Sequence, residues 1–496
     1  MRLRDRLTTL VTSLVAAVAL VVVPSPATGA PAPGPDPAGP VSTAGRWLVD
    51  ERGRVVITHG VNVVAKHAPY TPASLGFDAA DADLLAAEGF DSVRLGIIWK
   101  GVEPRPGEYD DAYLAQVRDT ARLLHARGIR VLLDSHQDQY HERFQGEFAP
   151  DWAVTVHDWP AEPRLGFPAN MFFMPALLRQ YEEFLHNAPG PGGVGLLDRY
   201  AAMWGHVAGF FAGEPGVMGY DILNEPMPGF NWPGCFTEAL CVDQNARLGD
   251  LHRKAAHAIR AADPHTPVFY EPFAVSNPGA QVNAPAPGVP GQALSFHSYC
   301  IPAITVGVNV GCEILDEHTI AMAQERAGRD DAPVLLTEYG AKKNPETITP
   351  VVRAAERRMI GWQYWAYCDC GDPTTSGPGE QGIIMDAHVP DPAAHADQAK
   401  LHALSAPRPT AVSGIPVSYG FDPAAGVFRL EWDTARAGGG PAFGPGSDTV
   451  VTVPRRQYPD GYRVTVDGGH VVSAPDAQKL VVRSDREGRV SLTVTR

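Results

Sequence analysis

The sequence predicts an α/β protein in which a (β/α)8 TIM barrel is followed by a C-terminal β-sandwich. Apolar runs of strand length alternate with helical stretches between residues 55 and 366, which is typical of parallel strands joined by crossover helices. Eight such strand-like runs occur, and eight strands close a barrel of this kind. After residue 407, short alternating runs between Gly, Pro and Asp turns replace the helical periodicity.

The first barrel strand is expected at Val55–Val63, and a helix at Asp78–Glu88 follows it and ends at Gly89. The other barrel strands are expected at Ser92–Trp99, Arg130–Asp134, Met218–Leu223, Pro267–Tyr270, Ala293–His297, Val334–Thr337 and Gly361–Ala366. Further helices are expected at Asp110–Arg127, Met174–His186, Arg199–Phe211, Asn245–Ala262, His318–Arg326 and Val351–Arg358. An open doubly wound sheet is the alternative, but no Gly-x-Gly-x-x-Gly turn follows the first strand.

The sandwich strands are expected at Val427–Trp432, Thr449–Val453, Tyr462–Val466 and Val490–Val494. The chain is therefore expected to divide into a signal peptide (1–30), a flexible lead-in (31–44), a barrel domain (45–406) and a β-sandwich domain (407–496). With 496 residues, 44% of them hydrophobic and 20% charged, the chain has the composition of a globular protein. The formal net charge of −15 argues against nucleic-acid binding and against anchoring on anionic lipid by charge.

The first 30 residues have the features of a secretory signal peptide. Arg2, Arg4 and Arg6 precede the apolar run Leu10–Val23, and Ala30 ends a short small-residue stretch. We expect cleavage after Ala30 and a secreted protein. The alternative is a single membrane anchor, although the apolar run is short for a span. Residues 31–44 are rich in Pro, Gly and Ala and read as a flexible linker.

Six cysteines in a secreted protein favour disulfide bonds. Spacing favours the pairs Cys235–Cys241 and Cys300–Cys312, which leaves Cys368 and Cys370. A bridge across one residue closes a tight ring, so a zinc site is the alternative, although no Cys-x2-Cys pair occurs.

Two carboxylates that are far apart in sequence each end an apolar, strand-like run. Glu225 follows the fourth expected strand in Asn224-Glu-Pro226, and Glu338 follows the seventh. The carboxyl ends of barrel strands meet on one face, and a pair of carboxylates is what double-displacement glycoside hydrolysis requires. For either residue alone, the alternative is a structural role such as capping the next helix.

Other polar and aromatic residues are expected at the same face: Arg94, His136, His297, Tyr299 and Trp365. Taken singly, each has a structural alternative, such as a buried ion pair for Arg94 or core packing for Trp365. Together with Asn224, Glu225 and Glu338 they resemble the pattern of glycoside hydrolase family 5 over roughly residues 45–405. The resemblance implies a retaining mechanism, with Glu225 as general acid/base and Glu338 as nucleophile. It also implies that Asn224 holds the sugar 2-hydroxyl, Tyr299 orients Glu338 and Trp365 lies under the sugar at the cleavage point.

Within this family the chain looks most like the secreted actinobacterial endoglycoceramidases, which cut between oligosaccharide and ceramide. The matching segments are Val61–His67, Asp134–Asp138, Leu223–Pro226, Thr337–Gly340, Gln363–Tyr367 and the C-terminal β-sandwich. By this resemblance Lys66 and Asp138 bind the sugar next to the scissile bond. The implied partner is a glycosphingolipid, and the protein is expected to contact a membrane or micelle at most transiently. We expect a monomer that needs no cofactor or metal.

Apolar loops give independent support for a lipid substrate. Residues 170–175 and 229–233 carry Met, Phe and Trp side chains in loop-like settings, which suit an acyl chain. The alternative is that Phe172 and Phe173 begin a packed helix.

A competing interpretation is an endo-β-glucanase or mannanase, which calls for a long cleft of Trp side chains, whereas the chain holds 9 Trp. A carbohydrate-binding protein on an inactive barrel is the third interpretation, and the presence of both glutamates argues against it.

Overall fold

The computed structural model describes residues 38–306, 308–342, 345–375 and 379–496. The predicted signal peptide and most of the predicted lead-in lie outside the described residues. Among the residues that are described, no helix has both the length and the apolar character needed to cross a bilayer.

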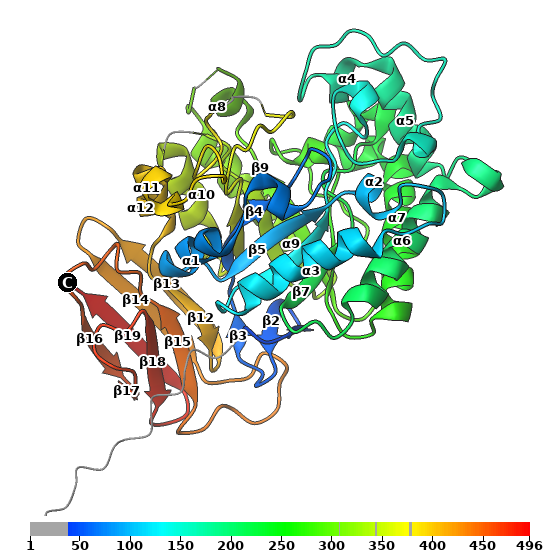
Figure 1. Cartoon of the computed structure of the whole chain (residues 1–496). Helices are drawn as coiled ribbons and strands as arrows, with labels where there is room; N and C mark the ends of the chain where they lie inside the picture. The colour runs from blue at the N-terminus through cyan, green and yellow to red at the C-terminus, as the bar shows by residue number, and fades with distance from the viewer. Residues whose placement is uncertain (1–37, 307, 343–344, 376–378) are drawn as a thin grey trace, which may run out of the picture. The chain divides into compact units, whose positions relative to one another are not determined.

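A closed barrel of eight parallel strands confirms the predicted fold class, within the described part of the chain (Figure 1). Its strands are β4 (His59–Val63), β5 (Ser92–Ile97), β6 (Arg130–Ser135), β7 (Val217–Asp221), β8 (Val268–Tyr270), β9 (Gln292–Ser298), β10 (Val334–Tyr339) and β11 (Gly361–Tyr364). The longer helices are α1 (Ala79–Ala87), α3 (Asp111–His125), α5 (Pro175–Leu185), α6 (Leu196–Phe211), α7 (Val242–Ala262), α9 (Cys312–Arg329) and α10 (Pro345–Arg357). Short helices are α2 (Trp99–Val102), α4 (Asn170–Phe173), α8 (Ile301–Val306), α11 (Pro392–His395) and α12 (Gln398–Leu404).

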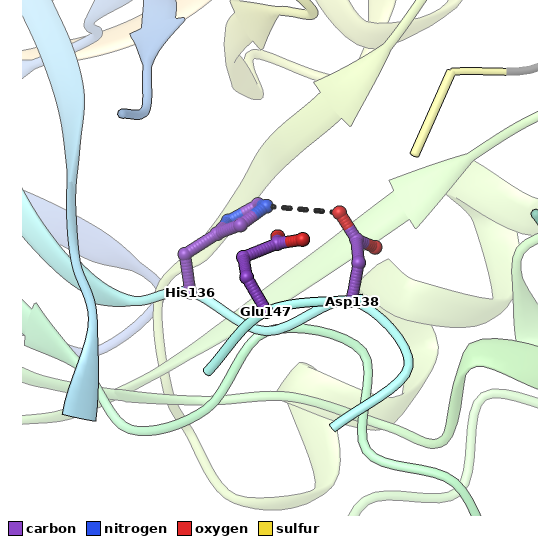
Figure 2. A group of neighbouring side chains, drawn as sticks. All are labelled: His136, Asp138 and Glu147. Atoms are coloured by element: carbon purple, nitrogen blue, oxygen red, sulfur yellow. Dashed lines mark ion pairs between the residues drawn. The ribbon is translucent and has the colours of Figure 1, made fainter. Parts of the chain in front are cut away.

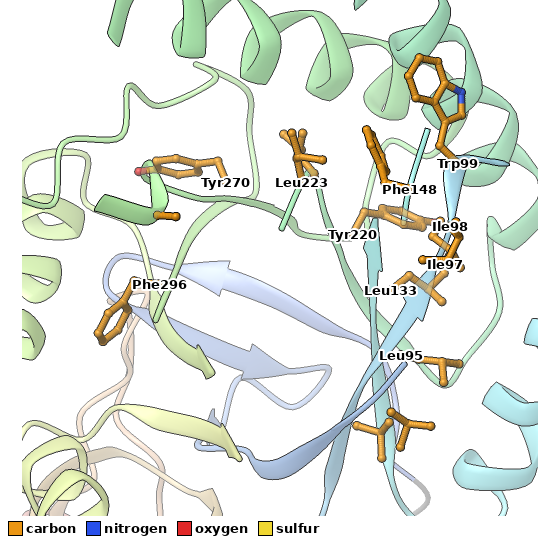
Figure 3. Packing of buried hydrophobic residues seen from close by; sticks show 14 of the residues in the cluster. Leu95, Ile97, Ile98, Trp99, Leu133, Phe148, Tyr220, Leu223, Tyr270 and Phe296 are labelled. Atoms are coloured by element: carbon orange, nitrogen blue, oxygen red, sulfur yellow. The ribbon is translucent and has the colours of Figure 1, made fainter. Parts of the chain in front are cut away.

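The barrel strands are buried on both faces, as expected for parallel strands covered by helices. In β5, Val93, Leu95 and Ile97 belong to the main hydrophobic core, which Figure 3 shows from close by. Arg94 alternates with them, so its side chain is directed toward the opposite side of the strand, into the barrel interior. The same alternation that builds the core therefore places a charge inside the barrel.

Helix α10 is longer than the predicted Val351–Arg358 and contains Pro350. A proline in a helix removes one backbone hydrogen bond, and this is why the sequence pattern suggested a later start. The structure begins the helix at Pro345, where a missing N–H costs nothing. The buried face around Ile348 and Val352 offsets the loss at Pro350.

The predicted strand Val55–Val63 is wrong as a single element. The structure divides it into β3 (Val55–Val56), which pairs with β12 (Arg408–Val412), and barrel strand β4. β1 (Val41–Ala44) and β2 (Trp47–Asp50) precede it as a hairpin, so a strand lies within the expected lead-in. The apolar run is continuous because both parts are buried, although in different sheets.

A sandwich of two antiparallel sheets follows the barrel, within the part of the chain that the structure describes. One sheet has the strand order β1-β2-β3-β12-β15-β18-β17 and the other β13-β14-β19-β16. The predicted strands correspond to β14 (Val427–Asp433), β15 (Asp448–Thr452), β16 (Arg463–Asp467) and β19 (Arg489–Thr495). Sequence patterns missed β12, β13 (Ile415–Asp422), β17 (Gly469–Val471) and β18 (Lys479–Ser484).

The N-terminal strands pack on both the sandwich and the barrel. Trp47 and Val55 lie in the sandwich core with Trp432. Leu48 and Val56, on the opposite face, form a small core with residues from the amino-terminal part of the barrel strands, among them Met218. These strands therefore bring segments from before and after the barrel together in one sheet.

Each of the six cysteines, all in the described part of the chain, forms a disulfide bond: Cys235–Cys241, Cys300–Cys312 and Cys368–Cys370. The two pairs that spacing favoured are confirmed. The remaining two cysteines bond to each other, so the zinc alternative is wrong for Cys368 and Cys370.

Arg408 is fully buried and connects the sandwich to the barrel. Its guanidinium donates to the carbonyl oxygens of Gly89 and Leu404 at 2.7 and 3.0 Å. We predict that Arg408→Met lowers the free energy of unfolding by about 3 kcal/mol, because it leaves buried carbonyl oxygens and acids without their partner.

Urea denaturation followed by tryptophan fluorescence measures this effect. The matched control is Arg483→Met, which removes an ion pair between Arg483 and Asp448 at the surface and should change the midpoint little, because solvent screens exposed ion pairs. Equal midpoints for the two variants would contradict the role of Arg408.

Candidate active site

Of the ten residues singled out in the sequence, nine lie at, or just beyond, the carboxyl ends of barrel strands, and Arg94 lies in the middle of its strand. They are Lys66 beyond β4, Arg94 in β5, His136 and Asp138 beyond β6, Asn224 and Glu225 beyond β7, His297 in β9 with Tyr299 beyond it, Glu338 in β10, and Trp365 beyond β11. The register explains part of this convergence. A bulge between β9 and β10 skips Thr337 and brings Glu338 opposite His297.

Glu338 is held by two donors. Arg94 Nη1 donates to its Oε1 at 2.6 Å, and the Tyr299 hydroxyl donates to its Oε2 at 2.9 Å. Burial raises the pKa of Glu338 to about 6, although the positive charges of His297 and Arg94 act to lower it. Glu338 is therefore ionised above about pH 6 and protonated below it.

Glu225 takes its hydrogen bonds from neighbouring loops and strands. Asn277 Nδ2 donates to its Oε1 at 2.6 Å, and His297 Nδ1 lies 2.8 Å from the same oxygen. The backbone of Glu225 is in the left-handed region, with φ of 45°, a conformation that costs about 1–3 kcal/mol for a residue other than glycine. Gln137 Nε2 stabilises this turn by donating to the Glu225 carbonyl oxygen at 2.7 Å.

The two glutamates are close enough to act on one bond. An oxygen of Glu225 and an oxygen of Glu338 lie within 4.8 Å of each other and of a His297 nitrogen. Retaining glycosidases hold their carboxyl groups about 5–5.5 Å apart, whereas inverting enzymes need about 6.5–9.5 Å to admit a water molecule. The spacing therefore fits direct attack by one carboxylate and proton transfer by the other.

Arg94 connects Glu338 to the barrel wall. Its guanidinium forms ion pairs with Asp134 at 2.9 Å and Asp221 at 3.0 Å, in addition to Glu338. Arg94 Nη2 also donates to Asn224 Oδ1 at 3.0 Å. These acids raise the pKa of Arg94 far above its ordinary value, against the effect of burial, so the guanidinium is a permanent positive charge.

A second group of residues surrounds Lys66. Its ammonium lies 2.5 Å from Asp138 and 3.1 Å from Asp372, and 4.5 Å from the centre of the Trp365 ring. His136 stacks on Trp365 with ring centres 5.1 Å apart. Burial opposes the charge of Lys66, but Asp138 and Asp372 outweigh it and raise the lysine pKa.

Figure 2 shows His136 and Asp138 with Glu147, a buried acid beside them. Such a trio has the donors of a metal site, but the Lys66 ammonium already lies 3.9 Å from Glu147 and closer to Asp138. Burial raises the pKa of Glu147 well above its ordinary value. We therefore interpret the group as a lysine-centred charge cluster next to Trp365.

Sequence reasoning missed several residues that complete the site, notably Glu271 and Asn277. Glu271 follows β8 and lies 2.8 Å from His297 Nε2. A signal was present, because Glu271 directly precedes Pro272 after a strand, just as Glu225 precedes Pro226. Asn277 lies in an irregular loop segment, and no pattern pointed to it.

Comparisons with known proteins agree with this geometry. The family model "Cellulase (glycosyl hydrolase family 5)" matches residues 49–371, and "Glycoside hydrolase family 5 C-terminal domain" matches residues 407–495. Endoglycoceramidase I of Rhodococcus hoagii (strain 103S) is 34% identical over 93% of this chain and 89% of the relative. Two solved structures of Endo-glycoceramidase II from Rhodococcus sp. each cover 90% of this chain and 99% of theirs. The Ganglioside GM3 complex has a TM-score of 0.71 at 26% identity, and the lactosyl-enzyme intermediate has 0.72 at 27%.

Proposed function

This chain belongs to glycoside hydrolase family 5, and we propose that it is a retaining endo-β-glycosidase that hydrolyses the bond between oligosaccharide and ceramide in glycosphingolipids. The observation that carries the proposal is the pair Glu225 and Glu338, whose oxygens lie within 4.8 Å. The endoglycoceramidase relatives support the substrate class.

In the first step Glu338 attacks the anomeric carbon as a carboxylate. The glycosidic bond breaks, and Glu225 gives its proton to the departing oxygen, so that the ceramide leaves as an alcohol. The negative charge of the pair moves from Glu338, now an ester, to Glu225. The solved lactosyl-enzyme intermediate of a relative supports such a covalent step.

In the second step water attacks the anomeric carbon of the glycosyl ester. Glu225, now a carboxylate, takes a proton from the water, and the carbon–oxygen bond to Glu338 breaks. The free oligosaccharide leaves, and both glutamates return to their starting states. Proton transfer of this kind contributes about 10²–10⁴-fold to the rate.

The other residues are assigned by their contacts. Tyr299 and Arg94 orient Glu338 through the hydrogen bonds given above. Asn224, fixed by Arg94 and by its own donation to Gln137 O at 2.9 Å, is placed to bind the sugar 2-hydroxyl. Trp365, beside His136, forms the floor of the sugar site, with Lys66 and Asp138 next to it.

Exposed aromatic side chains on nearby loops fit the lipid part of the substrate. Phe173 and Phe230 are 56% and 42% exposed, and Trp159 lies against Phe230 with ring centres 5.8 Å apart. Met171 and Met174 are buried, so the expected contact of methionines with an acyl chain is wrong and only the aromatic rings remain available. Transient contact of this surface with a micelle or membrane is part of the proposal.

We further propose that the chain is secreted after cleavage of residues 1–30 and acts as a monomer. The three disulfide bonds support an oxidising compartment.

Product analysis tests the substrate class. We predict that the purified protein, incubated with a ganglioside in detergent, releases an intact oligosaccharide and free ceramide, both detected by mass spectrometry. Glu338→Gln is the control for contaminating activity. Shortened cello- or manno-oligosaccharides in parallel reactions, with the ganglioside intact, would instead indicate a polysaccharide-cleaving enzyme.

Replacing each of the two glutamates should have a different effect on the hydrolysis of a dinitrophenyl β-lactoside, whose leaving group needs no proton. We predict that Glu225→Gln gives a burst of one equivalent of dinitrophenolate, because attack by Glu338 persists, followed by turnover about 10²–10⁴-fold slower than wild type. Glu338→Gln should show no burst. Stopped-flow absorbance measures both phases.

A matched control for these variants is Glu325→Gln, which changes an exposed glutamate on α9 that pairs with Arg329. It should leave burst and turnover unchanged. Turnover by Glu338→Gln at the wild-type rate would contradict the assignment of the nucleophile.

The pH dependence of kcat/KM is expected to follow the ionisation of Glu338. Its pKa of about 6 lies above the ordinary value, and the carboxylate is the reactive form. We therefore predict that kcat/KM falls about tenfold per pH unit below pH 6, measured as initial rates on the soluble lactoside. A profile that stays flat down to about pH 4.5, near the ordinary value for glutamate, would contradict the raised pKa.

A further inference from the structure

Glu271 is a third buried carboxylate at the active site, beside the two that the proposed mechanism uses. It is 2% exposed and directly follows barrel strand β8. Neither the family pattern found in the sequence nor the two-step mechanism gives it a role. A buried acid is costly unless it is paired and hydrogen-bonded.

Glu271 holds His297 and Glu225 at the same time. Its Oε1 lies 2.8 Å from His297 Nε2, and its Oε2 accepts the backbone N–H of Glu225 at 2.5 Å. The second contact stabilises the left-handed backbone of Glu225. One carboxylate therefore forms an ion pair with an imidazole ring and a hydrogen bond with the backbone of the residue proposed as acid/base.

His297 presents its other nitrogen to both reacting glutamates. Nδ1 lies 2.8 Å from Glu225 Oε1 and 3.4 Å from Glu338 Oε2. Burial alone would lower the pKa of His297, but Glu271 and Glu338 outweigh burial and raise it well above its ordinary value. The ring is therefore an imidazolium with one acid on Nε2 and two acids within reach of Nδ1.

The proposed reaction moves one negative charge between these two acids. Glu338 carries the charge before glycosyl transfer, and Glu225 carries it in the glycosyl-enzyme. An imidazolium between them is adjacent to the charge in both states, so it needs no movement to stabilise either one. Preorganised charges of this kind stabilise a developing charge without any cost of reorganisation during the reaction.

We propose that Glu271 is a positioning residue that keeps His297 protonated as a stationary counter-charge for both steps of the reaction. The inference rests on the proposed retaining function. Glu271 itself touches neither the substrate nor the transferred proton; it acts through His297 and through the backbone of Glu225.

Other charged and titratable groups surround this pair and enter its pH dependence. Those that face Glu271 or His297 are Arg94 from β5, Asp221 from β7, Glu225 beyond β7, His252 from α7, Tyr299 beyond β9 and Glu338 from β10. Arg94 remains in place when Glu271 is neutralised, so the guanidinium still stabilises Glu338. Losing the charge of Glu271 should therefore shift the pH dependence of the reaction and should not abolish activity.

The test is Glu271→Gln, which keeps the shape of the side chain and removes its charge. His297 should then lose its proton near neutral pH, and the Glu225–Glu338 pair should lose its nearest imidazolium. We expect the acid limb of kcat/KM to move up by about one pH unit, since a neighbouring opposite charge shifts a pKa by about 1–3 units. Because both steps lose the counter-charge, the burst and the steady-state rates should both fall, by about 10–100-fold.

Two controls separate this role from a structural one. Asp316→Asn removes another buried carboxylate, which accepts a hydrogen bond from Ser298 next to His297 but has no contact with the imidazole; it should leave the acid limb in place. Glu271→Asp keeps the charge and should restore the wild-type pH limb in part. An unshifted limb in Glu271→Gln would overturn the proposal.

Nitrogen-15 NMR of histidine-labelled wild-type protein tests the charge of His297 directly, and a variant serves only to assign the resonances. The His297 resonances, assigned by their loss in His297→Asn, should stay in the imidazolium range from about pH 5 to pH 8, above the ordinary histidine pKa of about 6.5. A neutral His297 at pH 7 would overturn the proposal. If the wild type failed to hydrolyse the lactoside, the proposed function would fall, while the same NMR spectra compared between wild type and Glu271→Gln would still decide whether Glu271 keeps His297 charged.

Discussion

The buried guanidinium of Arg94 is the interaction on which the active-site end of the barrel depends. It lies in β5 and forms ion pairs with Asp134 of β6, Asp221 of β7 and Glu338 of β10, all of them buried. A charge in a protein interior is tolerated only when it is paired and hydrogen-bonded. The planar, forked shape of arginine allows one side chain to satisfy several acids at once, so the closed barrel and the buried carboxylates inside it stabilise each other.

The site carries more acids than Arg94 can neutralise, and two further cations form ion pairs with the remaining acids. His297 lies among Glu225, Glu271 and Glu338, and Lys66 lies among Asp138, Glu147 and Asp372. Asp134 connects the two clusters indirectly. One of its oxygens pairs with Arg94, which contacts Glu338, and the other pairs with His136, which lies beside Asp138. The electrostatics of the site are therefore a property of the whole network and not of two isolated glutamates.

Sequence patterns predicted the barrel because strand burial and helix amphipathicity are local and periodic. They also located Glu225 and Glu338, because each stands where an apolar run ends. Glu271 shows the limit of this reasoning: it stands at an equivalent position before Pro272, but β8 is only three residues long and gave a weak signal. Asn277 lies in an irregular segment, so only the fold brings it to within 2.6 Å of Glu225.

The sequence by itself determined the alternation of strands and helices in the barrel, the two favoured disulfide pairs and two of the acids at the strand ends, Glu225 and Glu338, because these depend on neighbours along the chain. The tertiary structure decided how segments before and after the barrel share one sheet, since β3 pairs with β12 more than 350 positions away. It also decided which acid faces which cation. Burial and charge pairing are set by residues from different strands, and no local pattern contains that information.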